Sequence, residues 1–79
     1  MNWIVNTSKA FAKRLEKAAP KEEERIALAF RLAYGREPAR EEMRASVDFV
    51  RDAGTKDRLT PWEQFAQAIL ASNEFLWVD

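Results

Sequence analysis

The sequence predicts an all-α protein, a compact four-helix bundle with a short docked C-terminal tail. Three observations predict this fold class. Helix-forming residues dominate, above all Ala, Glu, Arg, Lys and Leu. Apolar residues recur at the three- and four-residue spacing of a helix face, and no stretch alternates as a strand would. The two glycines and three prolines fall at the boundaries of the periodic segments.

Length and composition allow one domain and exclude several kinds of site. A chain of 79 residues buries roughly 60% of the surface that its unfolded form exposes. Cys and His are both absent from the sequence, which excludes disulfides, thiolate zinc sites, Fe–S clusters and ordinary haem ligation, so we expect no cofactor. The 13 basic and 13 acidic residues balance, which weighs against nonspecific binding of nucleic acid. No apolar run has the roughly 18 residues of a membrane span, and the first residues do not resemble a signal peptide.

The first helix is expected over about residues 3–18, with Asn2 as a plausible cap. Pro20 ends it. One face of this helix carries the apolar residues Ile4, Phe11, Leu15 and Ala18.

The second helix is expected over about residues 21–34, and the acids at 22–24 oppose the positive end of its dipole. Gly35 occupies the position of a left-handed C-cap. Leu28 and Leu32 form a second apolar stripe, so we expect neighbouring helices on two sides. The main stripe consists of Ile26, Ala29, Phe30, Ala33 and Tyr34.

The third helix is expected over about residues 38–53, with Pro38 in its first turn and Gly54 after its end. Its apolar face consists of Met43, Val47 and Val50, with Phe49 alongside.

The fourth helix, about residues 61–72, has the clearest start. Thr60 can cap it, Pro61 suits its first position, Glu63 completes a capping box, and Leu59 can staple to a later apolar side chain. The buried stripe is expected to consist of Trp62, Phe65, Ala66, Ile69 and Leu70.

The tail, residues 73–79, is apolar at four of its last five positions, "FLWVD". An apolar terminus that does not pack forms an adhesive exposed patch. We therefore expect a non-helical tail that docks on the helices with Phe75 as its buried anchor. If it returns to the end of the second helix, Arg36 and Glu74 can form a bidentate ion pair that locks it.

Several stretches together resemble a known family. They are "FAKRL" at 11–15, "RLAYGREP" at 31–38, "EE" at 41–42 and "WEQFAQAILASNEFLWVD" at 62–79. The chain resembles the C-terminal region of large secreted planctomycete proteins of unknown function, which often accompanies cytochrome-c-like modules. A shorter similarity links it to helical domains of phycobilisome-linker type in exported bacterial proteins.

The resemblance implies an all-helical module at the end of an exported parent protein, in the periplasm or at the cell surface, and it implies no reaction. Nothing in the chain itself gives its location. The family places Thr-Pro before the acids of the third helix, where this chain has Ala39 and Arg40. Loss of that cap costs about 1 kcal/mol of helix stability and puts the boundary near residue 38 in doubt.

Other candidate sites are weaker. Lys9, Lys13 and Lys17 lie four residues apart on one helix face, a candidate anion-binding stripe or simply a solvated face. The acidic residues lack the spacing of a calcium loop, and the serines have no His partner. Aromatic residues can anchor partners, so Trp3, Trp77, Leu28 and Leu32 are a candidate interface, although core packing explains tryptophans equally well.

The sequence thus indicates a non-catalytic structural or protein-interaction module, whose partners are other domains of a parent protein or a separate protein. Three alternatives stay open. The chain can bind an anionic surface or nucleic acid through the lysine stripe, help an enzyme elsewhere on the parent chain, or be an artificial sequence patterned on the family. Nucleic acid is the less expected partner because the net charge is zero.

Overall fold

The structure, a computed structural model, describes residues 2–56 and 58–72, and of residues 2–5 the backbone alone. This part of the chain is all-α and folds as a bundle of four helices, which confirms the predicted fold class. The predicted tail at 73–79 lies outside the described residues. The helices are α1 (Asn2–Ala18), α2 (Glu22–Tyr34), α3 (Arg40–Asp52) and α4 (Pro61–Ala71).

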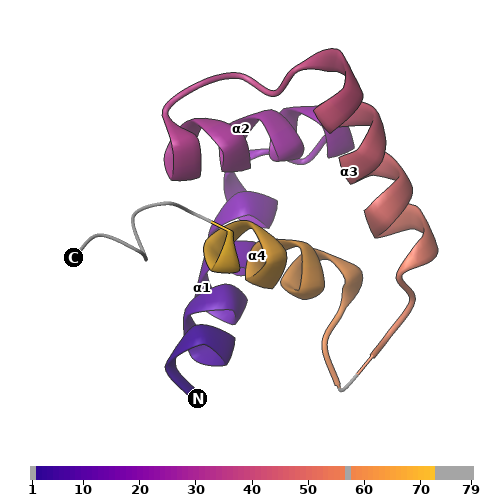
Figure 1. Cartoon of the computed structure of the whole chain (residues 1–79). Helices are drawn as coiled ribbons and strands as arrows, with labels where there is room; N and C mark the ends of the chain where they lie inside the picture. The colour runs from indigo at the N-terminus through magenta and orange to yellow at the C-terminus, as the bar shows by residue number, and fades with distance from the viewer. Residues whose placement is uncertain (1, 57, 73–79) are drawn as a thin grey trace.

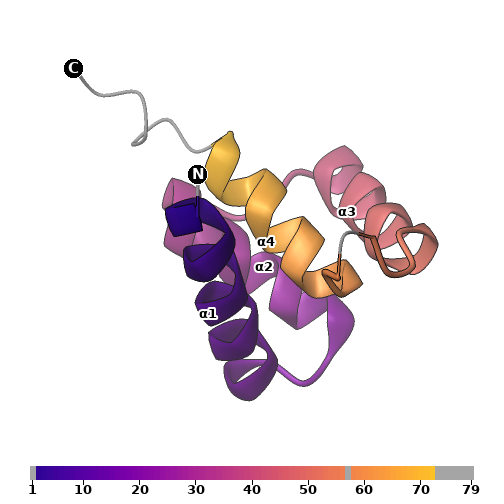
Figure 2. The same ribbon diagram turned by 90° about the horizontal axis from the view of Figure 1, so that it is seen from below.

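In the bundle, α2 and α4 each contact the other three helices, and α1 packs most extensively against α4. Figure 1 shows α2 lying above α4, with α3 along one side of both. Seen from below in Figure 2, α4 runs between α1 and α3. In Figure 1, α1 runs steeply across the direction of α2 and α4, which themselves run in a similar direction.

The buried face of α1 differs from the predicted one. Its buried residues are Ser8, Ala12 and Leu15, and Ala19, directly after the helix, is buried as well, while Ala18 is exposed and Phe11 is half-buried. The prediction was therefore wrong for Ala18, because the helix turns a face of mostly small residues to its neighbours. Small side chains let two helices approach closely, which fits the extensive contact of α1 with α4.

The core is centred on α2, as predicted. Ile26, Ala29, Phe30 and Ala33 are buried in one cluster, against which Tyr34 packs at the end of the helix. Gly35 adopts φ +72°, and its N–H donates to the carbonyl of Arg31 over 3.0 Å, which closes the helix with a left-handed cap.

The α3 helix begins at Arg40, so Pro38 precedes it instead of occupying its first turn. The N-cap is Ala39, which has no side-chain oxygen to bind the first free N–H groups. Glu42 supplies the other half of a capping box, because its Oε1 accepts from the Ala39 N–H over 2.8 Å. Val50 is buried in the core, and Met43 and Val47 pack against it.

The start of α4 carries the predicted capping box. Thr60 Oγ1 accepts from the Glu63 N–H over 3.2 Å, and Glu63 Oε1 accepts from the Thr60 N–H over 3.0 Å. Leu59 is buried, but the residue at the staple position is Gln64, whose Nε2 donates to the carbonyls of Gly54 and Leu59. The turn before α4 is therefore fastened by an amide and not by a hydrophobic staple.

One long side chain joins three helices. Arg25 of α2 donates through Nε to the carbonyl of Ala19 over 2.8 Å, just beyond the end of α1. Its guanidinium also lies 4.7 Å from the centre of the Trp62 ring of α4. A cation at a helix C-terminus interacts favourably with the dipole and satisfies a carbonyl left without a helical partner.

Candidate functional site

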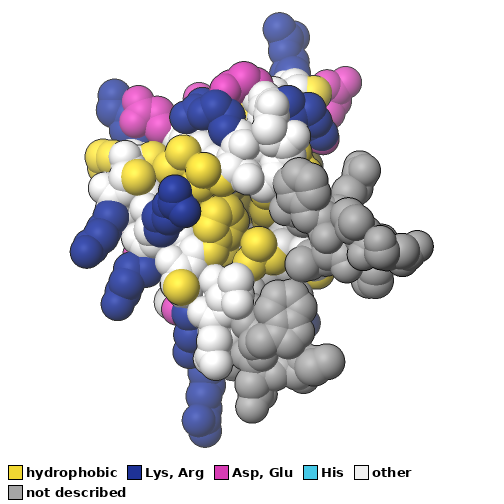
Figure 3. Space-filling model, turned by 90° about the vertical axis from the view of Figure 1, so that its left-hand side faces the viewer, with side chains coloured by type: hydrophobic (Ala, Val, Ile, Leu, Met, Phe, Trp, Pro, Cys, Tyr) yellow, Lys and Arg dark blue, Asp and Glu magenta, His cyan; other side chains and the backbone are white. Residues whose placement is uncertain are grey.

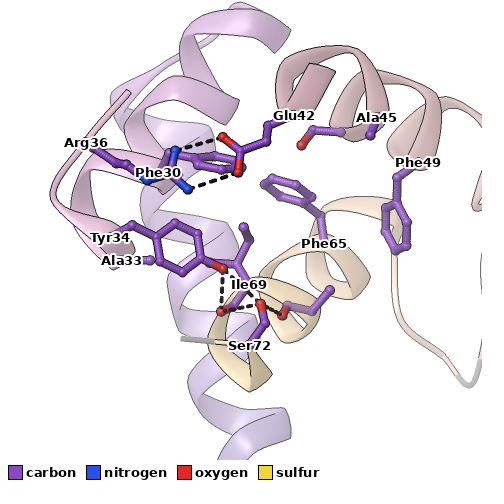
Figure 4. Close-up of a pocket in the computed structure, with 12 residues that line it drawn as sticks. Phe30, Ala33, Tyr34, Arg36, Glu42, Ala45, Phe49, Phe65, Ile69 and Ser72 are labelled. Atoms are coloured by element: carbon purple, nitrogen blue, oxygen red, sulfur yellow. Dashed lines mark hydrogen bonds and ion pairs between the residues drawn. The ribbon is translucent and has the colours of Figure 1, made fainter. Parts of the chain in front are cut away.

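A cleft of about 680 Å³ opens between α2, α3 and α4. Figure 4 shows the side chains that point into it from the three helices. Aromatic rings make up its floor and polar groups stand at its rim. Its size falls within the range of ligand-binding clefts in proteins.

The floor consists of phenylalanines. Phe30 and Phe65 are buried, whereas Phe49 keeps 40% of its surface exposed. The rings of Phe49 and Phe65 lie 6.3 Å apart, centre to centre, and are tilted by 54°. Phe30 in turn meets Tyr34 edge to face at 5.3 Å. Since a ring as large as phenylalanine is normally buried, Phe49 marks the point at which the cleft opens to solvent.

An ion pair stands at one rim of the cleft. Arg36 donates from Nη1 and Nη2 to the two carboxylate oxygens of Glu42, over 2.7 and 2.9 Å. The guanidinium also lies 5.7 Å from the Phe30 ring and 5.6 Å from the Tyr34 ring. The hydrogen bonds from Arg36 and from the Ala39 N–H hold the pKa of Glu42 at about 2. Glu42 is therefore ionised at neutral pH and is a weak base.

A hydroxyl pair stands at another rim. The Tyr34 hydroxyl lies 2.8 Å from Ser72 Oγ and donates its one hydrogen to that oxygen, while the Ile69 carbonyl, 3.3 Å away, is a weaker alternative acceptor. Ser72 Oγ in turn donates to the carbonyl of Ala68 over 2.8 Å. This network ties the end of α2 to the end of α4, and it places Ser72 on the wall of the cleft.

The predicted tail lock is described only in part. Arg36 lies at the rim of the cleft, while Glu74 and Phe75 lie outside the described residues. The structure brings Arg36 together with Glu42, a partner that the sequence analysis missed because it paired Arg36 with Glu74 alone. The signal was available, since Glu42 lies three residues after the N-cap, where a carboxylate folds back over the helix start.

The predicted interface residues are described for α2 alone. Leu28 is half-buried and packs against the core, whereas Leu32 is 40% exposed. The side chain of Trp3 and the whole of Trp77 lie outside the description. Figure 3 shows hydrophobic side chains gathered on the face turned to the left of Figure 1, with Lys and Arg side chains projecting around them.

The lysine stripe is exposed along its length. Lys9, Lys13 and Lys17 all lie on the outer side of α1. A shallow depression of about 450 Å³ is lined by Lys13, Arg14 and Lys17 together with two alanines. Its lining is thus basic, and whether it binds an anion stays a prediction.

Two other kinds of feature are absent from residues 2–56 and 58–72. These residues contain no group of three acidic, His or Cys side chains that could hold a metal ion. None of their helices has both the length and the apolar character needed to cross a membrane. Comparison with protein-family models, with curated proteins and with solved structures found no match.

Proposed function

We propose that the chain is a non-catalytic protein-interaction module whose cleft binds an apolar segment of polypeptide. The observation that carries the proposal is the exposure of Phe49, which keeps 40% of its surface exposed beside the buried Phe65 in the cleft between α2, α3 and α4. Exposed aromatic rings on rigid helices are typical anchors of protein interfaces, because they add contact area at little entropic cost.

The polar rim supports an apolar ligand and not a charged one. Arg36 and Glu42 neutralise each other, and the Tyr34 and Ser72 hydroxyls are hydrogen-bonded together. These paired polar groups line the rim of the cleft, so the aromatic floor is the surface that an incoming ligand would contact. An incoming apolar side chain would gain roughly 25 cal/mol for each Å² of apolar surface that it removes from water.

The same chemistry argues against a hydrolytic site. Glu42 has a pKa of about 2, so it accepts a proton poorly near neutral pH. Ser46 also lines the cleft, but the chain contains no histidine to activate a serine hydroxyl.

Binding of N-acetyltryptophanamide, observed by amide NMR shifts, tests the proposal. The chain to use is full-length and carries serine at positions 75–78, because those apolar residues would compete with the probe. We expect shifts centred on Phe49, Ala45 and Ala68. Ala68→Glu, which places a charge in the cleft wall, should abolish them. The same substitution at the exposed Ala10 on α1 is the control and should leave them intact. Absence of shifts at the cleft, or shifts that Ala68→Glu does not affect, would refute the proposal.

The proposal also concerns the source of the apolar segment. An external apolar segment that occupies the cleft can come from another domain of a parent protein or from a separate partner, and the resemblance noted in the sequence supports an exported parent. Limited proteolysis of a purified parent protein tests whether the segment comes from another of its domains. A change in the protease sensitivity of those domains on Ala68→Glu would support this source. A cleavage pattern that the substitution leaves unchanged would contradict it.

A second candidate function is supported by the basic depression on α1. Three cationic side chains, Lys13, Arg14 and Lys17, surround it on an exposed helix face. Contacts with phosphates weaken steeply as salt increases, since they release condensed counterions. Binding of a labelled oligonucleotide or of anionic vesicles that is lost at moderate salt, and lost in Lys13→Gln/Lys17→Gln, would support this function. No binding at low salt would exclude it.

A further inference from the structure

We infer that the segment that fills the cleft is the chain's own tail, residues 73–79, bound within the same molecule. This inference rests on the proposed function, because it names the ligand of that same cleft. Three features of the chain lead to it: where the described helix ends, what the next residues are, and how far they reach.

The end of α4 lies at the cleft itself. Ser72 caps the helix, its N–H donates to the carbonyl of Ala68 over 3.1 Å, and its hydroxyl meets Tyr34 on the cleft wall. Figure 4 shows Ser72 beside Tyr34 and Ile69 at the edge of the hollow. The tail therefore starts at the site that it is proposed to fill.

The tail has the reach to enter the cleft. An extended chain advances at most about 3.3–3.6 Å per residue, so Phe75 can lie up to about 10 Å from Ser72. The cleft encloses about 680 Å³, the volume of a cube about 9 Å on a side, so this span is comparable with the distance from the edge of the cleft to its floor.

The tail also has matching chemistry. Its positions 75–78 are Phe, Leu, Trp and Val, which suit a floor built from Phe30, Phe49 and Phe65. Glu74 precedes them, and Arg36 stands at the rim. A guanidinium carries five N–H donors in a planar fork, so Arg36 can hold Glu42 and still approach a second carboxylate.

Binding within one molecule has a measurable consequence. A tethered ligand acts at an effective concentration of about millimolar, without any loss of translational freedom. A cleft that its own tail fills nine-tenths of the time binds an outside ligand about tenfold more weakly. An external partner then has to displace the tail.

Paramagnetic NMR on the full chain tests the inference. The sequence has no cysteine, so Asp79→Cys provides a single attachment site for a nitroxide. We expect the label to broaden the amide signals of Ala45, Phe49 and Ala68 more than those of Lys13 and Lys17 on the outer side of α1. Ala68→Glu should remove the broadening at Ala45 and Phe49, and Ala10→Glu, the matched control, should preserve it.

Three outcomes would overturn the inference. The first is broadening confined to Leu28 and Leu32, which would place the tail on another face. The second is broadening between molecules, seen when an isotope-labelled chain without the nitroxide is mixed with the nitroxide-bearing chain. Such broadening would identify a second copy of the chain as the ligand. The third is uniform weak broadening, which would mean that the tail binds nowhere.

The tryptophanamide titration separates this inference from the proposed function. If the serine-tail chain binds the probe and the wild-type chain binds it about tenfold more weakly, both stand. If the two chains bind it equally, the cleft is an interaction site but the tail is not its ligand. If the serine-tail chain does not bind the probe, the proposed function fails by itself, whatever the nitroxide reports.

Discussion

Replacing Arg25 tests the packing argument most directly, because this side chain joins α1, α2 and α4. It is half-buried, it donates to the Ala19 carbonyl over 2.8 Å, and its guanidinium lies 4.7 Å from the centre of the Trp62 ring. A second hydrogen bond, to the Pro20 carbonyl, is longer at 3.3 Å and exposed, so we expect it to add little.

The size of the effect follows from these contacts. A hydrogen bond from a charged donor is worth about 1.5 kcal/mol or more, and a cation–π contact about 0.5–1 kcal/mol. Arg25→Ala should therefore lower the free energy of unfolding by about 2 kcal/mol. For a domain of this size, that corresponds to a fall in Tm of about 8–16 °C. Arg25→Lys keeps the charge but loses the planar fork, so it should cost about 1 kcal/mol.

Urea unfolding followed by far-UV circular dichroism measures these changes. Arg31→Ala is the matched control, because Arg31 lies on the same helix and its side chain forms an exposed ion pair with Glu37. Its loss should cost no more than about 1 kcal/mol. A double-mutant cycle of Arg25→Lys with Trp62→Phe should give a coupling energy of about 0.5–1 kcal/mol. If Arg25→Ala costs no more than Arg31→Ala, the claim that Arg25 fastens three helices is wrong.

Three further substitutions and a pH series extend the test. Since the pKa of Glu42 is lowered to about 2, its contribution to stability is complete above about pH 4.5, declines as the pH falls, and is lost near pH 2; urea midpoints of wild type should show this fall, and Arg36→Gln should flatten it. Thr60→Ala removes the cap of α4 and should cost about 1 kcal/mol, which a thermal melt would detect as a Tm lower by about 4–8 °C; an unchanged Tm would contradict the capping box. Ile26 is fully buried, so Ile26→Ala should cost about 2–5 kcal/mol by urea unfolding, and a cost below 1 kcal/mol would show that the core is not centred there. Tyr34→Phe removes the hydroxyl that joins α2 to α4 and should cost about 1 kcal/mol, and an equal effect in a Ser72→Ala background would show that the two hydroxyls do not interact.

The helices and their ends were predictable because each carries a local signal. Gly35 takes the left-handed conformation expected after a helix, and Thr60 with Glu63 forms the capping box that their spacing indicates. Local signals depend on neighbours within about four residues, so a single sequence contains them. The exception is α3, where Ala39 replaces a capping residue and the helix starts later than Pro38 suggests.

The buried face of α1 was harder to predict because it is made of small residues. Periodicity is read from large apolar side chains, and it gives no weight to Ser8 and little to Ala12, both of which are buried. What buries them is close packing by other helices, mainly α4. That contact joins residues far apart in the sequence, so no local sequence pattern predicts it.

The partners of long polar side chains were also hard to predict. The docked-tail hypothesis paired Arg36 with Glu74, a pairing that stays a prediction, and did not consider Glu42. The structure shows that Glu42 accepts two hydrogen bonds from Arg36 across the turn between α2 and α3. Arg25 was not singled out at all, because its partners lie outside its own helix: Ala19 follows the end of α1, and Trp62 belongs to α4. Tertiary packing, and not spacing in the sequence, determines which partners the charged groups of such side chains contact.

These polar contacts also explain why the cleft stays open and is not filled by collapse of the helices. Arg36 and Glu42 fix the end of α2 against the first turn of α3, and Tyr34 with Ser72 fixes it against the end of α4. For α3 to move in and bury Phe49, the two hydrogen bonds between Arg36, which follows α2, and Glu42, in the first turn of α3, would have to break or rearrange. The hydrogen bond from the Ala39 N–H to Glu42 would survive, because both residues belong to the start of α3. A ligand that covers Phe49 from outside would keep the Arg36–Glu42 pair intact, which supports the proposed apolar segment.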